Sequence, residues 1–166
     1  MAVSDAFIKI GDIKGESSAE GHKEEIELMS WSWGATQSGS AQSIQGSTAG
    51  KVNVHDLTIT KLVDSSTPNL VKAVCGGTAY KEALLVCQKS AGAGKPKVPY
   101  LKIKLGNVLI SSYSTGGTGQ SDETTETISL NFGKVELTYT QQTAEGGAGK
   151  SSPACWNIPA GNDKWG

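Results

Sequence analysis

The stretch EEIELMSWSW (residues 24–33) alternates as a β-strand does, but its apolar phase shifts halfway along. Successive side chains of a strand point to opposite faces, so Ile26 and Leu28 share one face while Met29 and the two tryptophans share the other. Such a shift predicts either a bulge near Met29 or a strand that is covered on different faces at different points. A strand that bends around a small barrel, or crosses between two packed sheets, has this pattern.

Most of the chain outside this stretch also alternates with the period of two that strands show. Gly133 and Lys134 separate two such segments, which predicts a tight two-residue hairpin between them. The segments expected to form strands are residues 6–13, 52–62, 80–89, 99–107, 108–114, 123–132 and 134–142.

One segment, residues 66–77, has the features of a short helix. Ser66 or Thr67 can cap its start, and Pro68 suits its first turn. The pair of glycines after Cys75 ends it. Together with the strands, this helix predicts a mainly β fold, which we expect to be a compact two-sheet β-barrel or sandwich with one short α-helix on its flank.

Two regions depart from the strand pattern. Residues 34–51 form a long connection rich in glycine, serine and glutamine, and the strands on either side of it could pair as one hairpin arm. Structureless connections of that length tend to be either functional or disordered. Residues 144–166 form a polar, Gly/Ser-rich C-terminal tail, so we expect one β domain over residues 1–143 followed by this tail.

The composition argues against several classes of function. The net charge is −1, and all 15 basic residues are lysines. Nucleic-acid-binding proteins usually carry a basic surplus and use arginine for base and phosphate contacts, so we expect no nucleic-acid partner. The N-terminal residues lack the pattern of a signal peptide, and no stretch is apolar enough for a membrane span, which predicts neither a leader nor membrane insertion.

Candidate catalytic and metal-binding residues are few. His22 lies in the charged segment HKEE, and His55 stands beside Asp56 in an expected strand. Neither histidine matches a nucleophile elbow or a metal-ligand spacing, and an esterase-like site at His55 is the weakest hypothesis. The three cysteines have no CxxC spacing. We therefore expect no enzyme activity, no cofactor and no bound metal.

The paired indoles Trp31 and Trp33 allow two interpretations. Exposed, they would form a platform for sugar rings, and the chain would be a carbohydrate-binding β-sandwich. Buried, each would hide about 150–250 Å² in the core. In that case Ser30 and Ser32 would point the other way and form a smooth, polar, uncharged face.

Several motifs, in order along residues 1–142, resemble the Hcp family, the haemolysin-coregulated proteins of bacterial type VI secretion systems. The motifs are FIKIGDIKGES near the N-terminus, SWSWGATQSGS, GKVNVHDLTITKLVDSSTPNL, SSYSTGG and ETISLNFGKVELTY. The resemblance implies a compact two-sheet barrel with one helix on its side, which agrees with the pattern of the residues.

The resemblance also implies an assembly. Members of the family form homo-hexameric rings that stack into a tube, inside a contractile sheath and beneath a spike protein. The tube forms in the bacterial cytoplasm and is then secreted without a signal peptide, and small effectors travel in its channel. The implied function is that of a structural tube subunit and effector carrier, not of an enzyme.

Two sites follow from the resemblance. Ser32 lies on the strand that resembles the wall of the channel, and we expect Ser32, Ser30 and, in the STGGTG loop, Thr118 to contact effectors, because small side chains there would admit them. The arm of residues 34–51 corresponds to the family's extended loop, which reaches the adjacent ring. The residues expected to make this ring-stacking contact are Gln37, Ser38, Gly39, Ser40, Gln42, Ile44 and Gln45.

Overall fold

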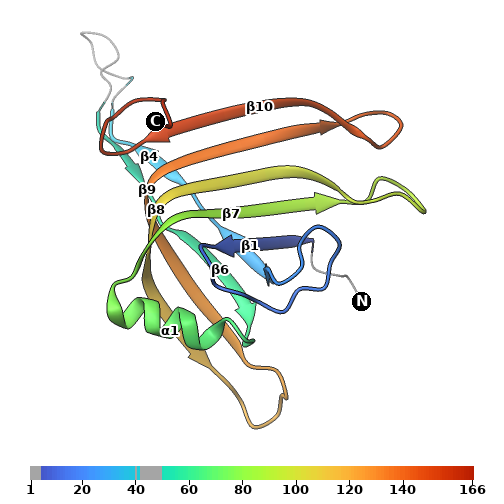
Figure 1. Ribbon diagram of the computed structural model, residues 1–166. Coiled ribbons are helices and arrows are strands. Elements are labelled where there is room, and N and C mark those ends of the chain that lie inside the picture. The colour runs from blue at the N-terminus through green and yellow to red at the C-terminus, as the bar shows by residue number, and fades with distance from the viewer. Residues whose placement is uncertain (1–4, 40, 42–49) are drawn as a thin grey trace.

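The structure, a computed structural model, describes residues 5–39, 41 and 50–166. Within these residues, eight strands form one curled sheet and two more form a separate hairpin (Figure 1). The elements in chain order are β1 (Ala6–Ile10), β2 (Ile26–Glu27), β3 (Ser30–Ser32), β4 (Ala35–Gln37), β5 (Val52–Val54), β6 (Leu57–Leu62), α1 (Thr67–Gly76), β7 (Ala79–Lys89), β8 (Val98–Gly116), β9 (Thr125–Gln142) and β10 (Ala148–Asn157).

A single stretch of chain joins the two ends of the curled sheet. The strand order is β2-β1-β7-β8-β9-β6-β3, so β2 and β3 lie at opposite ends although they are almost consecutive in sequence. The N–H of Leu28 donates to the carbonyl oxygen of Ala6 in β1 at 2.9 Å. The next N–H, that of Met29, donates to the carbonyl oxygen of Thr60 in β6 at 2.8 Å. Residues 26–32 therefore change partners here and close the curl.

This change of partner explains the phase shift in the sequence. The chain bends at Met29, whose side chain is 59% exposed. The expectation that Met29 shares a buried face with the tryptophans is therefore wrong, because the chain bends between the residue that pairs with β1 and the residue that pairs with β6. Trp31 and Trp33 are half-buried and pack against the core. They do not form the exposed platform on which the carbohydrate-binding hypothesis depends.

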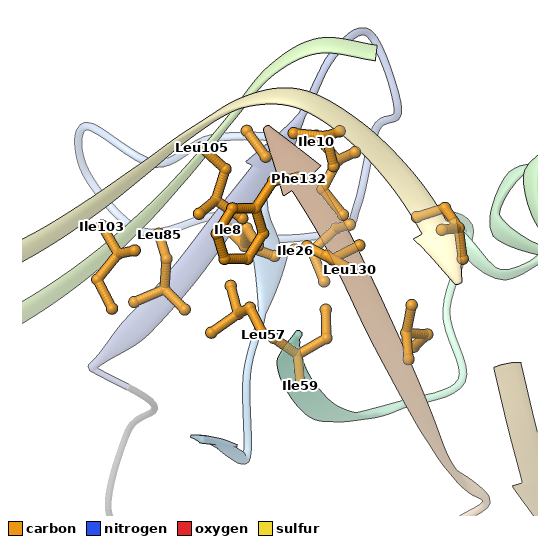
Figure 2. Packing of buried hydrophobic residues seen from close by; sticks show 14 of the residues in the cluster. Ile8, Ile10, Ile26, Leu57, Ile59, Leu85, Ile103, Leu105, Leu130 and Phe132 are labelled. Carbon is orange, nitrogen blue, oxygen red and sulfur yellow. The ribbon is translucent and has the colours of Figure 1, made fainter. Parts of the chain in front are cut away.

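The hydrophobic core lies inside the curl. Side chains from several strands of the sheet meet there, and they range from 0% to 6% exposed (Figure 2). Burying a side chain of this kind contributes about 1.5–3 kcal/mol, so this cluster is the main source of stability. The residues labelled in Figure 2 are Ile8, Ile10, Ile26, Leu57, Ile59, Leu85, Ile103, Leu105, Leu130 and Phe132. The expected mainly β fold with a helix on its flank is confirmed, and the second sheet is the β4-β5 hairpin.

The long strands β8 and β9 bend together and run through both halves of the curl (Figure 1). They are paired from Leu101 and Tyr139 to Gly116 and Thr125, with Gly106 opposite Lys134, so the expected hairpin at Gly133 and Lys134 is wrong. Gly133 instead lies against Asn107, which has a φ of 55°, and a Cβ at Gly133 would be 3.4 Å from the Asn107 Nδ2. The glycine thus marks a bend within a strand pair and not a turn between strands.

The helix α1 begins and ends within one residue of its expected bounds. Gly77, with a φ of 62°, ends it in the left-handed conformation that glycine adopts at no steric cost. Ser66 precedes the helix, but its hydroxyl donates to the carboxylate of Asp64 and does not cap the helix N-terminus. The start of α1 is therefore held by a side-chain network and not by a simple cap.

The C-terminal residues continue the sheet. β10 pairs with β9 over most of its length, so much of the expected polar tail is ordered as a strand. Within the described part of the chain β10 has β9 as its one partner, and Pro153 and Lys150 stand along this edge. Beyond β10, the chain returns to the sheet, where the Lys104 Nζ lies 4.6 Å from the centroid of the Trp165 ring.

Candidate functional site

Four neighbouring strands, β3, β6, β9 and β8, present a face made of hydroxyl side chains. Residues that lie opposite one another across the four strands form two rows, Ser32–Thr58–Ser129–Ser112 and Ser30–Thr60–Thr127–Ser114. Because side chains two residues apart on a strand share a face, both rows point the same way. We call these eight residues the hydroxyl face. They are exposed or half-buried, and none of them carries a charge or is larger than threonine.

The opposite face of the same four strands is packed against the core. Between the two hydroxyl rows lie Trp31, Ile59, Ile128 and Tyr113, again opposite one another across the strands. Ile59 and Ile128 are fully buried. The sheet is therefore packed on one side and polar on the other, as antiparallel sheets commonly are.

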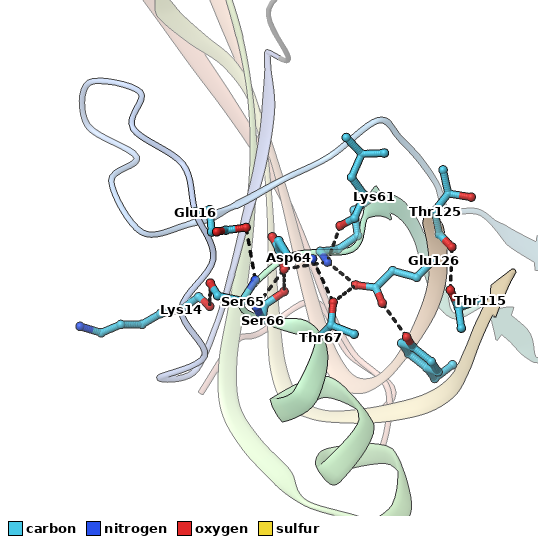
Figure 3. A network of polar contacts seen from close by, with 12 residues as sticks. Lys14, Glu16, Lys61, Asp64, Ser65, Ser66, Thr67, Thr115, Thr125 and Glu126 are labelled. Atoms are coloured by element: carbon cyan, nitrogen blue, oxygen red, sulfur yellow. Dashed lines mark hydrogen bonds and ion pairs between the residues drawn. The ribbon is translucent and has the colours of Figure 1, made fainter. Parts of the chain in front are cut away.

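An ion pair is buried on this packed side, between β6 and β9. Lys61 is 0% exposed, Glu126 is 1% exposed, and their charged groups are in direct contact. The Lys61 Nζ also donates to the Asp64 Oδ1 and to the carbonyl oxygen of Leu62, each at 2.9 Å. The Thr67 hydroxyl, at the start of α1, donates to the Glu126 carboxylate at 2.8 Å (Figure 3).

Tyr113 joins this network from β8. Its hydroxyl donates to the Glu126 Oε2 at 2.6 Å. Burial raises the pKa of the Tyr113 phenol, and the hydrogen bond and negative charge of Glu126 raise it further, so the phenol remains a donor at neutral pH. The network thus ties β6, β9, β8 and the start of α1 together behind the hydroxyl face.

One end of the hydroxyl face carries a charged side chain, Asp56. Its carboxylate accepts hydrogen bonds from the Ser111 Oγ at 2.6 Å and from the Asn131 Nδ2 at 2.9 Å. The imidazole of the adjacent His55, which is exposed, makes no hydrogen bond to a serine or a carboxylate among the described residues. Asp56 therefore orders neutral polar groups, and the arrangement lacks the geometry of a Ser-His-Asp triad.

The other residues considered for chemistry, His22 and Cys87, are packed against or buried among neighbouring side chains. The His22 ring stacks on Phe7 with their centroids 4.5 Å apart, and its Nδ1 lies 2.8 Å from the Glu25 Oε2. Cys87 is a buried free thiol whose pKa is raised by burial. Over residues 5–39, 41 and 50–166, no group of three metal-ligating side chains could hold an ion. In the same residues, no helix has the length and hydropathy needed to cross a membrane.

The predicted channel residues occupy two different places. Ser30 and Ser32 lie on the hydroxyl face, whereas Thr118 lies in the loop between β8 and β9, beyond the last paired residues Gly116 and Thr125. The six hydroxyl residues on β6, β9 and β8 were missed by the sequence reasoning. The signal that could have found them is a small hydroxyl at every second position in LTIT, TISL and SSYS.

The expected arm begins as a paired hairpin. β4 and β5 pair with Thr36 opposite Asn53, and the Ser38 Oγ extends the pairing by accepting from the N–H of Lys51 at 3.1 Å. A Cβ at Gly50 would lie 2.8 Å from the backbone nitrogen of Gly39, so the two sides of the arm stay close. Of the predicted ring-stacking residues, Gln37, Ser38 and Gly39 are exposed here, whereas Ser40, Gln42, Ile44 and Gln45 lie outside the described residues.

Comparisons with known proteins agree with one another. A family model described as type VI secretion system effector, Hcp, matches residues 7–139. The chain is 50% identical over 159 residues to protein Hcp1 of Pseudomonas aeruginosa, which covers 95% of this chain and 96% of that protein. A solved structure of a type six secretion system protein has a TM-score of 0.89 at 31% identity, covering 98% of this chain and 100% of its own. The crystal structure of Hcp1 from Salmonella typhimurium has a TM-score of 0.76 at 28% identity, covering 96% and 98%.

Proposed function

The chain belongs to the Hcp family of type VI secretion system proteins, and on this basis we propose that it is a structural tube subunit whose homo-hexameric rings stack into a tube. The observation that carries the proposal is the hydroxyl face, which continues without interruption across four strands. Six copies arranged with this face inward would line a channel with small, uncharged groups. A ring of this kind has the closed cyclic symmetry that is common in protein assemblies.

The channel of this ring carries small secreted effectors. A wall of small hydroxyl groups, with Asp56 as a charge at one end, leaves room for a folded protein and does not bind one charge type strongly. Many weak hydrogen bonds from hydroxyl groups, repeated in every subunit, hold the effector through their number. Ser32 and Ser30 are the proposed effector contacts on β3, with Thr118 as a third contact in the loop after β8.

The remaining partners follow from membership of the family. The tube forms in the bacterial cytoplasm, inside a contractile sheath and beneath a spike protein. Contraction secretes the tube without a signal peptide, and the subunit acts by assembly and not by catalysis.

Negative-stain electron microscopy and native mass spectrometry of the purified chain test the assembly directly. We expect hexameric rings, with stacks of rings at high protein concentration. A chain that stays monomeric at high concentration, and that is not secreted by a strain with an active type VI system, would contradict the proposal.

Enlarging a side chain of the hydroxyl face should obstruct the cargo and leave the subunit intact. Ser32→Gln is expected to reduce co-purification of a cognate effector about tenfold, which corresponds to roughly 1.4 kcal/mol of binding free energy. Rings counted by microscopy should be unchanged, because Ser32 is exposed and faces away from the core. Ser152→Gln, at an exposed position on β10, is the matched control. Equal effector recovery from both variants would show that Ser32 does not contact the cargo.

Shortening the arm should separate ring formation from ring stacking. Deleting residues 40–48 is expected to leave single rings and to abolish most tube formation and secretion, because each junction between rings loses all of its repeated contacts at once. The shortened arm can close, since Gly39 and Gly50 already lie side by side. Sedimentation separates rings from tubes. Loss of the rings themselves would assign the arm a different role.

A further inference from the structure

An apolar groove lies beside β3, at one edge of the hydroxyl face. Its volume is about 1060 Å³, and Met29, Leu62 and Val63 line it. These side chains are 59%, 39% and 44% exposed, and they are three of the five large apolar side chains that are exposed in the described part of the chain. Exposed apolar side chains gathered in one groove indicate a surface that another molecule covers.

The rim of this groove is acidic. Asp5, Glu16, Glu27, Asp64 and Glu123 line it, and two of these five carboxylates, those of Asp5 and Asp64, are paired with Lys97 and Lys61. Among the described residues, no cationic side chain pairs with Glu27 or Glu123. An apolar floor with a negative rim fits a partner that presents apolar side chains beside a lysine.

The helix α1 presents such a surface. It contains no acidic residue, and its one charged residue, Lys72, is exposed and has no acidic partner among the residues that the structure describes. Pro68 and Cys75 are also exposed on α1, while Leu70 and Ala73 are buried on its other side. The helix packs against β8, which is the strand of the hydroxyl face farthest from β3.

The order of these strands decides which surfaces of two copies meet. In a ring whose channel is lined by the hydroxyl face, β3 of one copy stands next to β8 of its neighbour, because they are the first and last of the four strands. Met29, Ser30 and Trp31 bring the groove to the β3 edge, although Cys87 of β7 and Tyr100 of β8 also line it, and α1 lies against β8. We therefore propose that α1 of one copy docks in the apolar groove of the next copy, with Lys72 at the acidic rim.

This inference rests on the proposed ring and names the surfaces that build it. The contact is head-to-tail, with different patches on the two partners, which is the type of contact that closes a ring of more than two copies. The acidic rim and Lys72 attract each other over several ångströms, so assembly should weaken as salt is raised.

The native Cys75 thiol allows a direct test, because it is exposed on α1. In a Cys155→Ser background, Val63→Cys or Met29→Cys places a second thiol in the groove without disturbing the core. A short bismaleimide should then link copies into a covalent ladder that ends at the hexamer on a denaturing gel. Tyr139→Cys is the matched control, because Tyr139 is 45% exposed and does not line the groove. Adding Cys75→Ser to Val63→Cys should abolish the ladder.

Native mass spectrometry of the same samples separates the two levels of the proposal. Rings that form but give no ladder through Val63→Cys or Met29→Cys, or that give an equal ladder through Tyr139→Cys, would overturn the docking of α1 and leave the tube function standing. A parent chain that forms no rings would overturn the proposed function and the docking with it.

Charge reversal provides an independent measurement. Lys72→Glu should raise the protein concentration at which half of the chains are in rings by roughly tenfold. The pair Lys72→Glu with Glu123→Lys should recover much of this loss. Lys102→Glu, at an exposed lysine on β8 outside the groove and the helix, should leave ring assembly unchanged. Equal behaviour of Lys72→Glu and Lys102→Glu would contradict the contact.

Discussion

Replacing Lys61 by methionine is expected to lower the free energy of unfolding by about 3–5 kcal/mol, the cost of removing one partner of a buried ion pair. Lys61 is fully buried, and its loss leaves the carboxylates of Glu126 and Asp64 close together without a cation. Methionine keeps most of the side-chain length, so the change in packing is small. The shift in the midpoint of urea unfolding, at a fixed protein concentration, measures the loss.

Two further variants show whether charge is the cause of this loss. Lys102→Met, at an exposed lysine, should change stability by no more than about 0.5 kcal/mol. Lys61→Met combined with Glu126→Leu removes both buried charges and should recover part of the stability. Recovery is partial because Tyr113 and Thr67 lose their hydrogen-bond acceptor. If Lys61→Met were as stable as Lys102→Met, the ion pair would not be buried in solution.

Replacing Gly15 by alanine is expected to cost about 2–3 kcal/mol, at the upper end of what single substitutions usually do. A Cβ at this position would lie 2.5 Å from the carbonyl oxygen of Glu25 and 2.8 Å from the Cα of Ile26. Both atoms belong to the backbone, which is held nearby by the hydrogen bond from the Gly15 N–H to the carbonyl oxygen of Glu24 at 2.8 Å. The added methyl group therefore displaces the backbone at the start of residues 26–32, the segment that closes the curl.

Thermal unfolding measures this effect. For a chain of this size the melting temperature of Gly15→Ala should fall by roughly 5–10 °C. Gly116→Ala is the control, because a Cβ at Gly116 would have no neighbouring atom within 4 Å. Similar melting temperatures for the two variants would mean that the backbone near Gly15 can move aside at little cost.

Local periodicity predicted the elements of this fold better than their partners. The strands and α1 could be placed because two signals are local: the alternation along each strand, and the proline and glycines at the ends of the helix. The phase shift at residues 24–33 narrowed the fold to a barrel or a sandwich, but closure depends on which strands lie beside the bend at Met29, and sequence spacing does not contain that information. At Gly133 a local turn signal was misleading, since the glycine serves a bend shared with Asn107.

The buried ion pair has a signal in the sequence. Lys61 is in phase with Leu57 and Ile59, and Glu126 is in phase with Ile128, so both charges belong to the core face of their strands. Opposite charges that are each in phase with the buried side chains of their own strand suggest a buried ion pair. The candidate site was found only in part for a related reason: Ser30 and Ser32 stand out between tryptophans, whereas their six hydroxyl partners become a face only once the strand order is known.

The edge strand β10 has a consequence for self-association of the chain. An unpaired strand edge can template the growth of β-fibres, and the risk rises with protein concentration. β10 limits this risk, because Pro153 offers no N–H and the pairing with β9 is irregular between Ala148 and Ser151. This strand is therefore a poor edge for backbone pairing with another copy, which favours self-association through side-chain surfaces that can separate again.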